Sequence, residues 1–147
     1  MSDTLFVSTR KGLFTIARGG GWAISNVPEA ISQGDTPEEV AAMAESALVT
    51  ALSFYTDYTD GGRPLPRPSD RKDRPIALVP PLVAAKLALH DAMLAAGVSN
   101  VVLGKRLGVD EISVRRLRDP LHRGHIDSIE SALRALGRRL EVAIAAA

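Results

Sequence analysis

The segment LGKRLGVDEISVRRLR, residues 103–118, constrains the fold more than any other part of the chain. Two short helices that cross closely need a small residue at the crossing and a residue that tolerates a left-handed backbone in the turn. Gly104 and Gly108 meet these requirements, and Asp110 is a suitable N-cap for the second helix. Aliphatic residues recur at helical spacing on the facing sides: Leu103, Leu107, Val109, Val114 and Leu117. The pattern predicts a helix-turn-helix over residues 100–119, with a plain helical hairpin as the alternative.

The outward positions of this unit are mostly basic, which is typical either of a solvated helix face or of a DNA-reading helix. Residues in the first half of the second helix would reach base edges in a major groove, where arginine can bind guanine in bidentate fashion. These candidates are Glu111, Ile112, Arg115 and Arg116. Other polar side chains are better placed to contact phosphates. These candidates are Asn100, Lys105, Arg118 and Arg123.

The charge of the chain is divided between its two halves. Residues 1–70 carry five Lys and Arg against nine Asp and Glu, a balance of −4, whereas residues 71–147 carry thirteen against eight, a balance of +5. A basic half suits a polyanion, and an acidic half suits a basic protein. Residues 59–75 are rich in proline and glycine and lack apolar periodicity, so they predict a connector between domains 1–70 and 76–147.

Element signals on either side of the connector differ. Before it, two apolar runs flank three glycines as in a hairpin, another short strand ends at Gly34, and Thr36, Pro37 and Glu39 open a helix as a capping box. After it come a strand at residues 76–79, four helices and a final strand over residues 138–144. We therefore expect an α+β fold class: a small N-terminal β-sheet plus one helix, followed by an α-helical domain with a C-terminal strand.

Several function classes lack support in the sequence. The chain has no cysteine, and His90, His122 and His125 have no acidic or thiol partner at ligand spacing, so we expect surface or loop-packing histidines, no metal and no cofactor. No catalytic set converges, so we expect that the chain is not an enzyme. No apolar run is long enough for a signal peptide or a bilayer span, so we expect a cytoplasmic protein without a membrane partner.

The order of these motifs resembles HicB-type antitoxins with a C-terminal helix-turn-helix, over roughly residues 20–144. The most specific parts are the helix start GDTPEE and the block RRLRDPLHRGHIDSIESALRALGRRL. The resemblance implies that the N-terminal domain is a partial ribonuclease-H-like fold without the nuclease carboxylates. It also implies that this domain covers HicA, a small mRNA-cleaving toxin, and that the C-terminal domain binds operator DNA and represses the chain's own operon.

The resemblance directs attention to further residues. Alternation in the N-terminal strands makes Trp22, Ile24 and Ile31 candidates for an apolar centre against the toxin. The final strand has no partner nearby in the sequence, so we expect it to pair across a two-fold axis in a homodimer or higher homo-oligomer. Two other functions remain open: a transcription regulator whose N-terminal domain senses something other than a toxin, and an enzyme of nucleic-acid metabolism.

Overall fold

The structure, a computed structural model, describes residues 5–9, 12–18, 22–24, 27–32, 37–57, 62–65, 76–142 and 144. Side chains are described for residues 43–57, 62–65, 79–142 and 144. The sheet therefore enters the description through its backbone alone.

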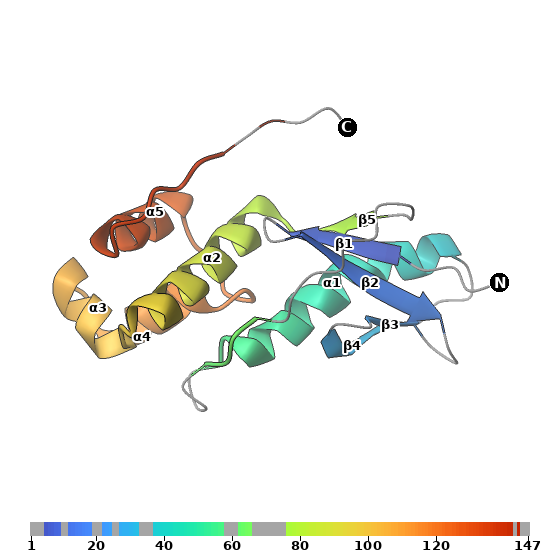
Figure 1. The fold of residues 1–147 in the computed structure, drawn as a ribbon, viewed down its shortest axis with the longest axis horizontal. Helices are drawn as coiled ribbons and strands as arrows, with labels where there is room; N and C mark the ends of the chain where they lie inside the picture. The colour runs from blue at the N-terminus through green and yellow to red at the C-terminus, as the bar shows by residue number, and fades with distance from the viewer. Residues whose placement is uncertain are drawn as a thin grey trace.

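Five strands form one sheet in the order β4-β3-β2-β1-β5 (Figure 1). The strands are β1 (Leu5–Thr9), β2 (Gly12–Arg18), β3 (Trp22–Ile24), β4 (Val27–Ser32) and β5 (Ile76–Leu78). Neighbours among β1 to β4 pair antiparallel, whereas β5 pairs parallel with β1 and sets Ile76 opposite Phe6. Because β5 follows the predicted connector, the sheet joins segments from both sides of it.

The helices among the described residues are α1 (Pro37–Tyr55), α2 (Pro81–Ala96), α3 (Asn100–Leu107), α4 (Glu111–Arg118) and α5 (Ile126–Ala135). Helix α1 lies along the sheet in Figure 1 and packs against β4 and β5. Two predicted helix limits are confirmed: α1 begins at Pro37, and α2 is followed by its C-cap Gly97, whose φ of 62° is left-handed. The predicted N-cap of α1, Thr36, lies outside the described residues.

None of the described helices is on its own long and apolar enough to cross a membrane. Among the described helices, α2 and α3 meet the criteria of length and composition when taken together, but they are bent by 107° at their junction.

Two clusters of buried apolar side chains share α2. The first core lies between α1, the end of β5 and the first half of α2; it holds Ala44, Leu48, Ala51, Leu52, Val79, Val83 and Leu87. The second core lies between α2, α3, α4 and α5; it holds Ala85, Leu89, Met93, Leu103, Val114, Ile129, Ala132 and Leu133. The division into domains 1–70 and 76–147 stays a prediction, although α1 and α2 meet in the first core.

The fold class expected from the sequence is wrong. With the exceptions of Val79 and Pro120, every buried apolar side chain that the structure describes belongs to one of the five helices. The described core is therefore helical, and the helical part of the chain does not close on the expected C-terminal strand. The predicted final strand is also absent from the described part of its segment, because residues 138–142 have no regular secondary structure.

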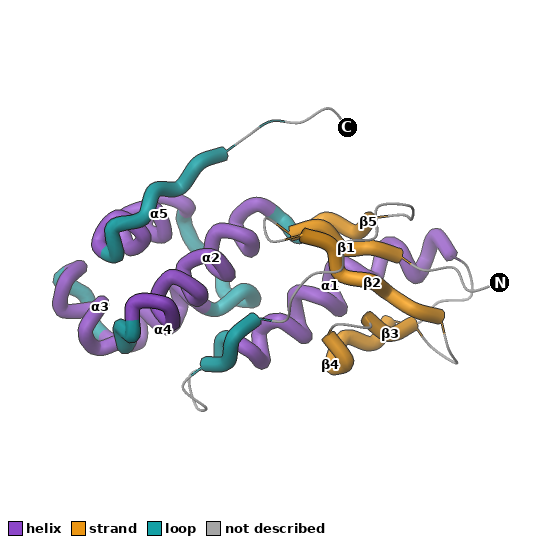
Figure 2. The backbone as a smooth tube through the Cα atoms, in the orientation of Figure 1, coloured by secondary structure: helices purple, strands orange, loops and turns teal. Residues whose placement is uncertain are grey.

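A local turn explains why the chain leaves the second core there. Gly137 has a φ of 69°, and its N–H donates to the carbonyl of Arg134 at the end of α5. The following tail extends away from the helices in Figures 1 and 2, and Val142 is 69% exposed. A strand needs a neighbour to satisfy its backbone hydrogen bonds, and the tail meets none among the described strands.

Candidate nucleic-acid interface

The close crossing of α3 and α4 depends on two glycines, as the sequence predicted. A Cβ atom at Gly104 would lie 2.7 Å from the carbonyl oxygen of Val109, closer than real Cβ atoms approach a backbone. Gly108 has a φ of 70°, which is the left-handed conformation that ends α3 and reverses the chain. These two positions fix the angle between the helices.

The predicted aliphatic anchors differ in depth. Leu103 and Val114 are fully buried in the second core, and Leu107 and Leu117 pack against it while partly buried. Val109 is 43% exposed, so its predicted packing is wrong. Val109 contributes to the crossing of the two helices through its backbone carbonyl oxygen, which lies against Gly104.

Both ends of α4 are held by side chains. Asp110 Oδ1 accepts a 2.7 Å hydrogen bond from Ser113 N, which confirms the predicted N-cap. The hydrogen bonds from Ser113 hold the pKa of Asp110 below its ordinary value. At the other end, Lys86 Nζ donates to the carbonyl oxygen of Arg116 over 2.8 Å. Lys86 is 1% exposed, and its burial lowers its pKa against the opposing effect of Asp119.

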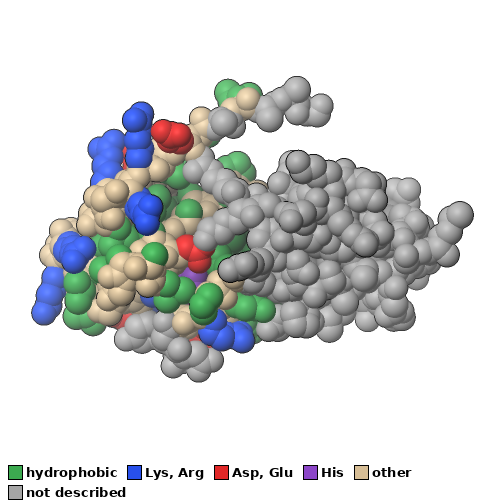
Figure 3. Space-filling model, in the orientation of Figure 1, with side chains coloured by type: hydrophobic (Ala, Val, Ile, Leu, Met, Phe, Trp, Pro, Cys, Tyr) green, Lys and Arg blue, Asp and Glu red, His purple; other side chains and the backbone are tan. Residues whose placement is uncertain are grey.

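Most of the predicted DNA contacts lie on the surface. Lys105, Ile112, Arg115, Arg116 and Arg123 are exposed. Figure 3 shows Lys and Arg side chains spread over the end of the molecule that the later helices form. The side chain of Glu111 is 23% exposed and accepts from Arg115 Nη2 over 3.2 Å, one turn along α4.

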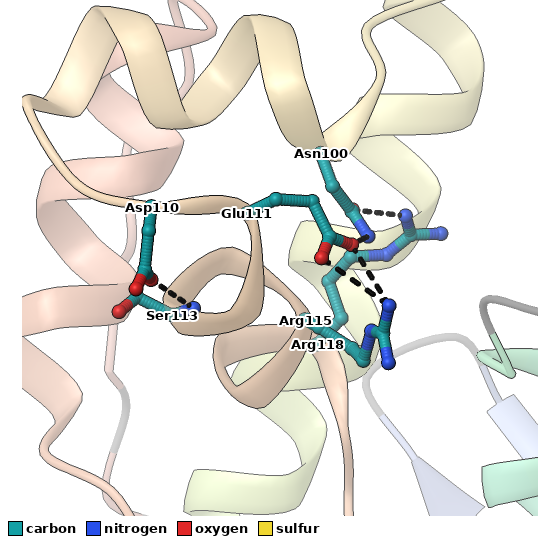
Figure 4. A network of polar contacts seen from close by, with 6 residues as sticks. All are labelled: Asn100, Asp110, Glu111, Ser113, Arg115 and Arg118. Carbon is teal, nitrogen blue, oxygen red and sulfur yellow. Dashed lines mark hydrogen bonds and ion pairs between the residues drawn. The ribbon is translucent and has the colours of Figure 1, made fainter.

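Two predicted phosphate contacts lie inside the molecule instead. Asn100 is 1% and Arg118 is 5% exposed, and Arg118 Nη1 donates to Asn100 Oδ1 over 2.7 Å (Figure 4). Asn100 Nδ2 in turn donates to Glu111 Oε1 over 3.1 Å. Burial lowers the pKa of the Arg118 guanidinium. These side chains bind other parts of the protein and are not on the surface that could meet a phosphate.

Sequence reasoning missed the role of two residues of α2, Lys86 and His90. His90 is fully buried and lies with Nδ1 2.7 Å from Arg118 Nη2 and with Nε2 2.8 Å from the carbonyl oxygen of Arg63. Lys86 and His90 are four residues apart, so they share one face of a helix whose only other polar residue is Asp91. That spacing was the available signal for a buried polar face.

The other two histidines and the predicted toxin contacts form no site among the described residues. His122 and His125 are exposed, and no group of three His, Asp or Glu among the described residues could hold a metal ion. Trp22 is paired with Ser32 in backbone register, Ile24 with Val27, and Ile31 with Ala23. The side chains of these three predicted toxin contacts lie outside the described residues.

Known proteins match most of the chain. The family described as HicB-like antitoxins of bacterial toxin–antitoxin systems matches residues 16–88. Antitoxin HicB 2 of Photorhabdus laumondii is 41% identical over 124 residues, which cover 83% of this chain and 86% of the relative. Antitoxin HicB of Pseudomonas fluorescens is 38% identical over 132 residues, 88% of each chain. Antitoxin HicB of Escherichia coli K12 is 35% identical over 130 residues, 87% of this chain and 93% of the relative.

These relatives define the class of the protein as bacterial antitoxins. The chain belongs to the HicB-like antitoxin family of bacterial toxin–antitoxin systems. The expectation that it is not an enzyme is thereby confirmed, because the family consists of regulatory antitoxins.

Proposed function

We propose that this antitoxin neutralises a HicA-type mRNA-cleaving toxin and represses its own operon by binding operator DNA, both in the cytoplasm. Family membership supports the toxin half of the proposal. The observation that carries the DNA half is the build of α4. It is a capped helix of eight residues with Val114 fully buried on one side and exposed arginines on the other.

The exposed side of α4 has the chemistry of a base-reading surface. Ile112, Arg115 and Arg116 are the proposed contacts to base edges, because they are exposed on this helix. Arg115 is paired with Glu111, but its side chain is 48% exposed, and such pairs are weak enough to exchange for a guanine or a phosphate. Lys105 and Arg123 flank this surface and suit phosphate contacts, which position a protein without reading sequence. Asn100 and Arg118 are left out because they are buried.

A single unit of this size binds DNA weakly, so the active form is a homodimer or a higher homo-oligomer on paired half-sites. Sedimentation of the full chain with and without its promoter fragment measures this. A monomer bound alone to the promoter would contradict it.

Replacing the exposed arginines tests the DNA half. Arg115→Ala and Arg116→Ala should each weaken binding to a duplex from the chain's own promoter by about 1–3 kcal/mol. Lys105→Ala should weaken promoter and shuffled duplexes alike and reduce the dependence on salt. Arg134→Ala is the matched control, because Arg134 pairs with Glu130 on α5 as Arg115 pairs with Glu111 on α4. Unchanged promoter affinity in the Arg115 and Arg116 double variant would contradict this assignment.

The toxin half rests on the family and on the acidic balance of −4 in residues 1–70, which should speed encounter with a basic toxin. Trp22, Ile24 and Ile31 are the proposed apolar contacts. The test is co-expression of the full chain with the toxin gene next to it, scored by surviving cells. Trp22→Ala should reduce rescue, and Phe54→Ala, at a 49% exposed position on α1, is the control. Full rescue by Trp22→Ala together with Ile24→Ala would refute the placement of this surface.

A further inference from the structure

One run of hydrogen bonds links the end of α1 to the exposed face of α4, and we call it the polar chain. It begins at the backbone of Arg63 and passes through His90, Arg118, Asn100 and Glu111. Glu111 then accepts from Arg115, which is one of the proposed base contacts. Figure 4 shows the last part of this chain, from Arg118 through Asn100 to the Glu111–Arg115 pair.

The geometry of His90 fixes which atoms of the polar chain donate hydrogen bonds and which accept them. An arginine guanidinium can only donate, so His90 Nδ1 must accept from Arg118. The carbonyl oxygen of Arg63 can only accept, so His90 Nε2 must carry the proton and donate to it. Only the neutral imidazole with its proton on Nε2 satisfies both partners. His90 therefore bridges the connector and α4 in a single arrangement.

The part of the connector that the structure describes, residues 62–65, is itself fixed to α1. Arg63 N donates to the carbonyl oxygen of Tyr55, the last residue of α1, over 2.8 Å, and the Arg63 guanidinium lies 4.6 Å from the centre of the Tyr55 ring. Figure 2 shows this loop segment, residues 62–65, beside the end of α1. Gly62 lies in close contact with the polar chain, because a Cβ atom at this position would lie 2.8 Å from both Arg118 Nη2 and His90 Cε1. Residues 62–65 are thus held by α1, and they contact His90 and Arg118 directly.

The two helical ends of α4 are both attached to the polar chain. Glu111 is the first residue of α4 and Arg118 is the last. Asn100, at the start of α3, forms a hydrogen bond with each of them. We propose that His90 and Arg118 are positioning residues for operator recognition, so that the connector at the end of α1 sets the orientation of the DNA-reading helix. This inference rests on the proposed operator function and adds to it a coupling between the N-terminal part and DNA reading.

A substitution in the connector tests the coupling without altering either DNA-reading helix. Gly62→Ala should reduce the ratio of promoter affinity to shuffled-duplex affinity by about tenfold, because it displaces charged hydrogen bonds that hold α4. Gly97→Ala is the matched control. Gly97 also has a positive φ, of 62°, but nothing lies within 4 Å of a Cβ there. Its affinity ratio should stay at the wild-type value.

A second variant covers the case in which Gly62→Ala does not fold. His90→Asn keeps an acceptor near the position of Nδ1 for Arg118 but removes the donor to the Arg63 carbonyl. Measured at a temperature where circular dichroism shows a folded chain, it should also lose promoter preference. A merely structural role would weaken promoter and shuffled duplexes equally and leave their ratio unchanged.

Hydrogen exchange of the α4 amides gives a readout without DNA. Exchange should be faster in Gly62→Ala and His90→Asn than in the wild type and in Gly97→Ala. If wild-type chain does not prefer its promoter duplex, the operator function fails, and the exchange rates alone decide whether the connector holds α4. Wild-type exchange in α4 and a wild-type affinity ratio in both variants would overturn the proposal.

Discussion

The first and second cores are both apolar inside, but their surroundings differ. Beside the first core the only buried polar residue among the described ones is Thr56, at the end of α1. Around the second core four polar side chains are buried: Lys86, His90, Asn100 and Arg118. Apolar contacts are non-directional and tolerate more than one arrangement, whereas hydrogen bonds with fixed donors and acceptors favour one. The second core therefore combines stability with a defined orientation for α4.

The largest effects should come from the apolar centres themselves, and they should be alike in the two cores. Leu48→Ala in the first and Leu103→Ala in the second should each lower the free energy of unfolding by about 2–5 kcal/mol, since both residues are fully buried. Urea denaturation measures this, with Met43→Ala and Val101→Ala as exposed controls on the same helices. Two separate transitions, each sensitive to only one of the variants, would show that the cores unfold independently.

The next effect should separate the buried arginine from the exposed ones. Arg118→Met leaves Asn100 Oδ1 and His90 Nδ1 without their donor, so it should lower the free energy of unfolding by about 1–3 kcal/mol. Arg115→Met, on the exposed side of the same helix, should change it by less than about 0.5 kcal/mol. Both values come from urea denaturation. Equal losses would remove the distinction between the arginines of α4.

How well the sequence predicted these parts depended on how local each signal is. Gly104, Gly108 and Asp110 act on backbone within a few residues, so their roles could be predicted and are confirmed. The interior position of Arg118 could have been predicted too, because it follows the buried Val114 by four residues and so shares its face. The bond from His90 to Arg63 could not, since it joins residues 27 apart whose approach depends on the packed fold.

The final strand is a case in which the sequence predicted an element that the described chain does not form. Residues 138–144 have a strand-like composition, but a strand forms only where another strand accepts its hydrogen bonds. The described sheet lies with α1, and the tail leaves α5 without reaching it. The pairing of this tail with a second copy of the chain stays a prediction. The toxin surface also stays a prediction, because the side chains of its residues lie outside the described residues.

A smaller effect should appear at acid pH at the start of α4. The pKa of Asp110 is lowered from its ordinary value of 3.8 in the folded chain, so its contribution to stability is present above that value and is lost as the pH falls through the lowered one. Asp110→Ser keeps an N-cap that does not titrate. Unfolding measured from about pH 5 to about pH 2 should show wild type losing its advantage over this variant. A constant difference across that range would contradict the role of the carboxylate.

The smallest effect should come from the exposed ion pair on α5. Glu130 Oε1 and Arg134 Nη2 are 2.7 Å apart, but their side chains are 39% and 72% exposed, so solvent screens the attraction. Glu130→Met should lower the free energy of unfolding by less than about 0.5 kcal/mol, and high salt should abolish the difference. Glu111→Met on α4 should cost more and keep part of its effect in salt, because it also removes the acceptor of the hydrogen bond from the buried Asn100. If the two substitutions behave alike in urea at low and high salt, the bond to Asn100 adds nothing, and the polar chain ends at Asn100 before it reaches the exposed face of α4.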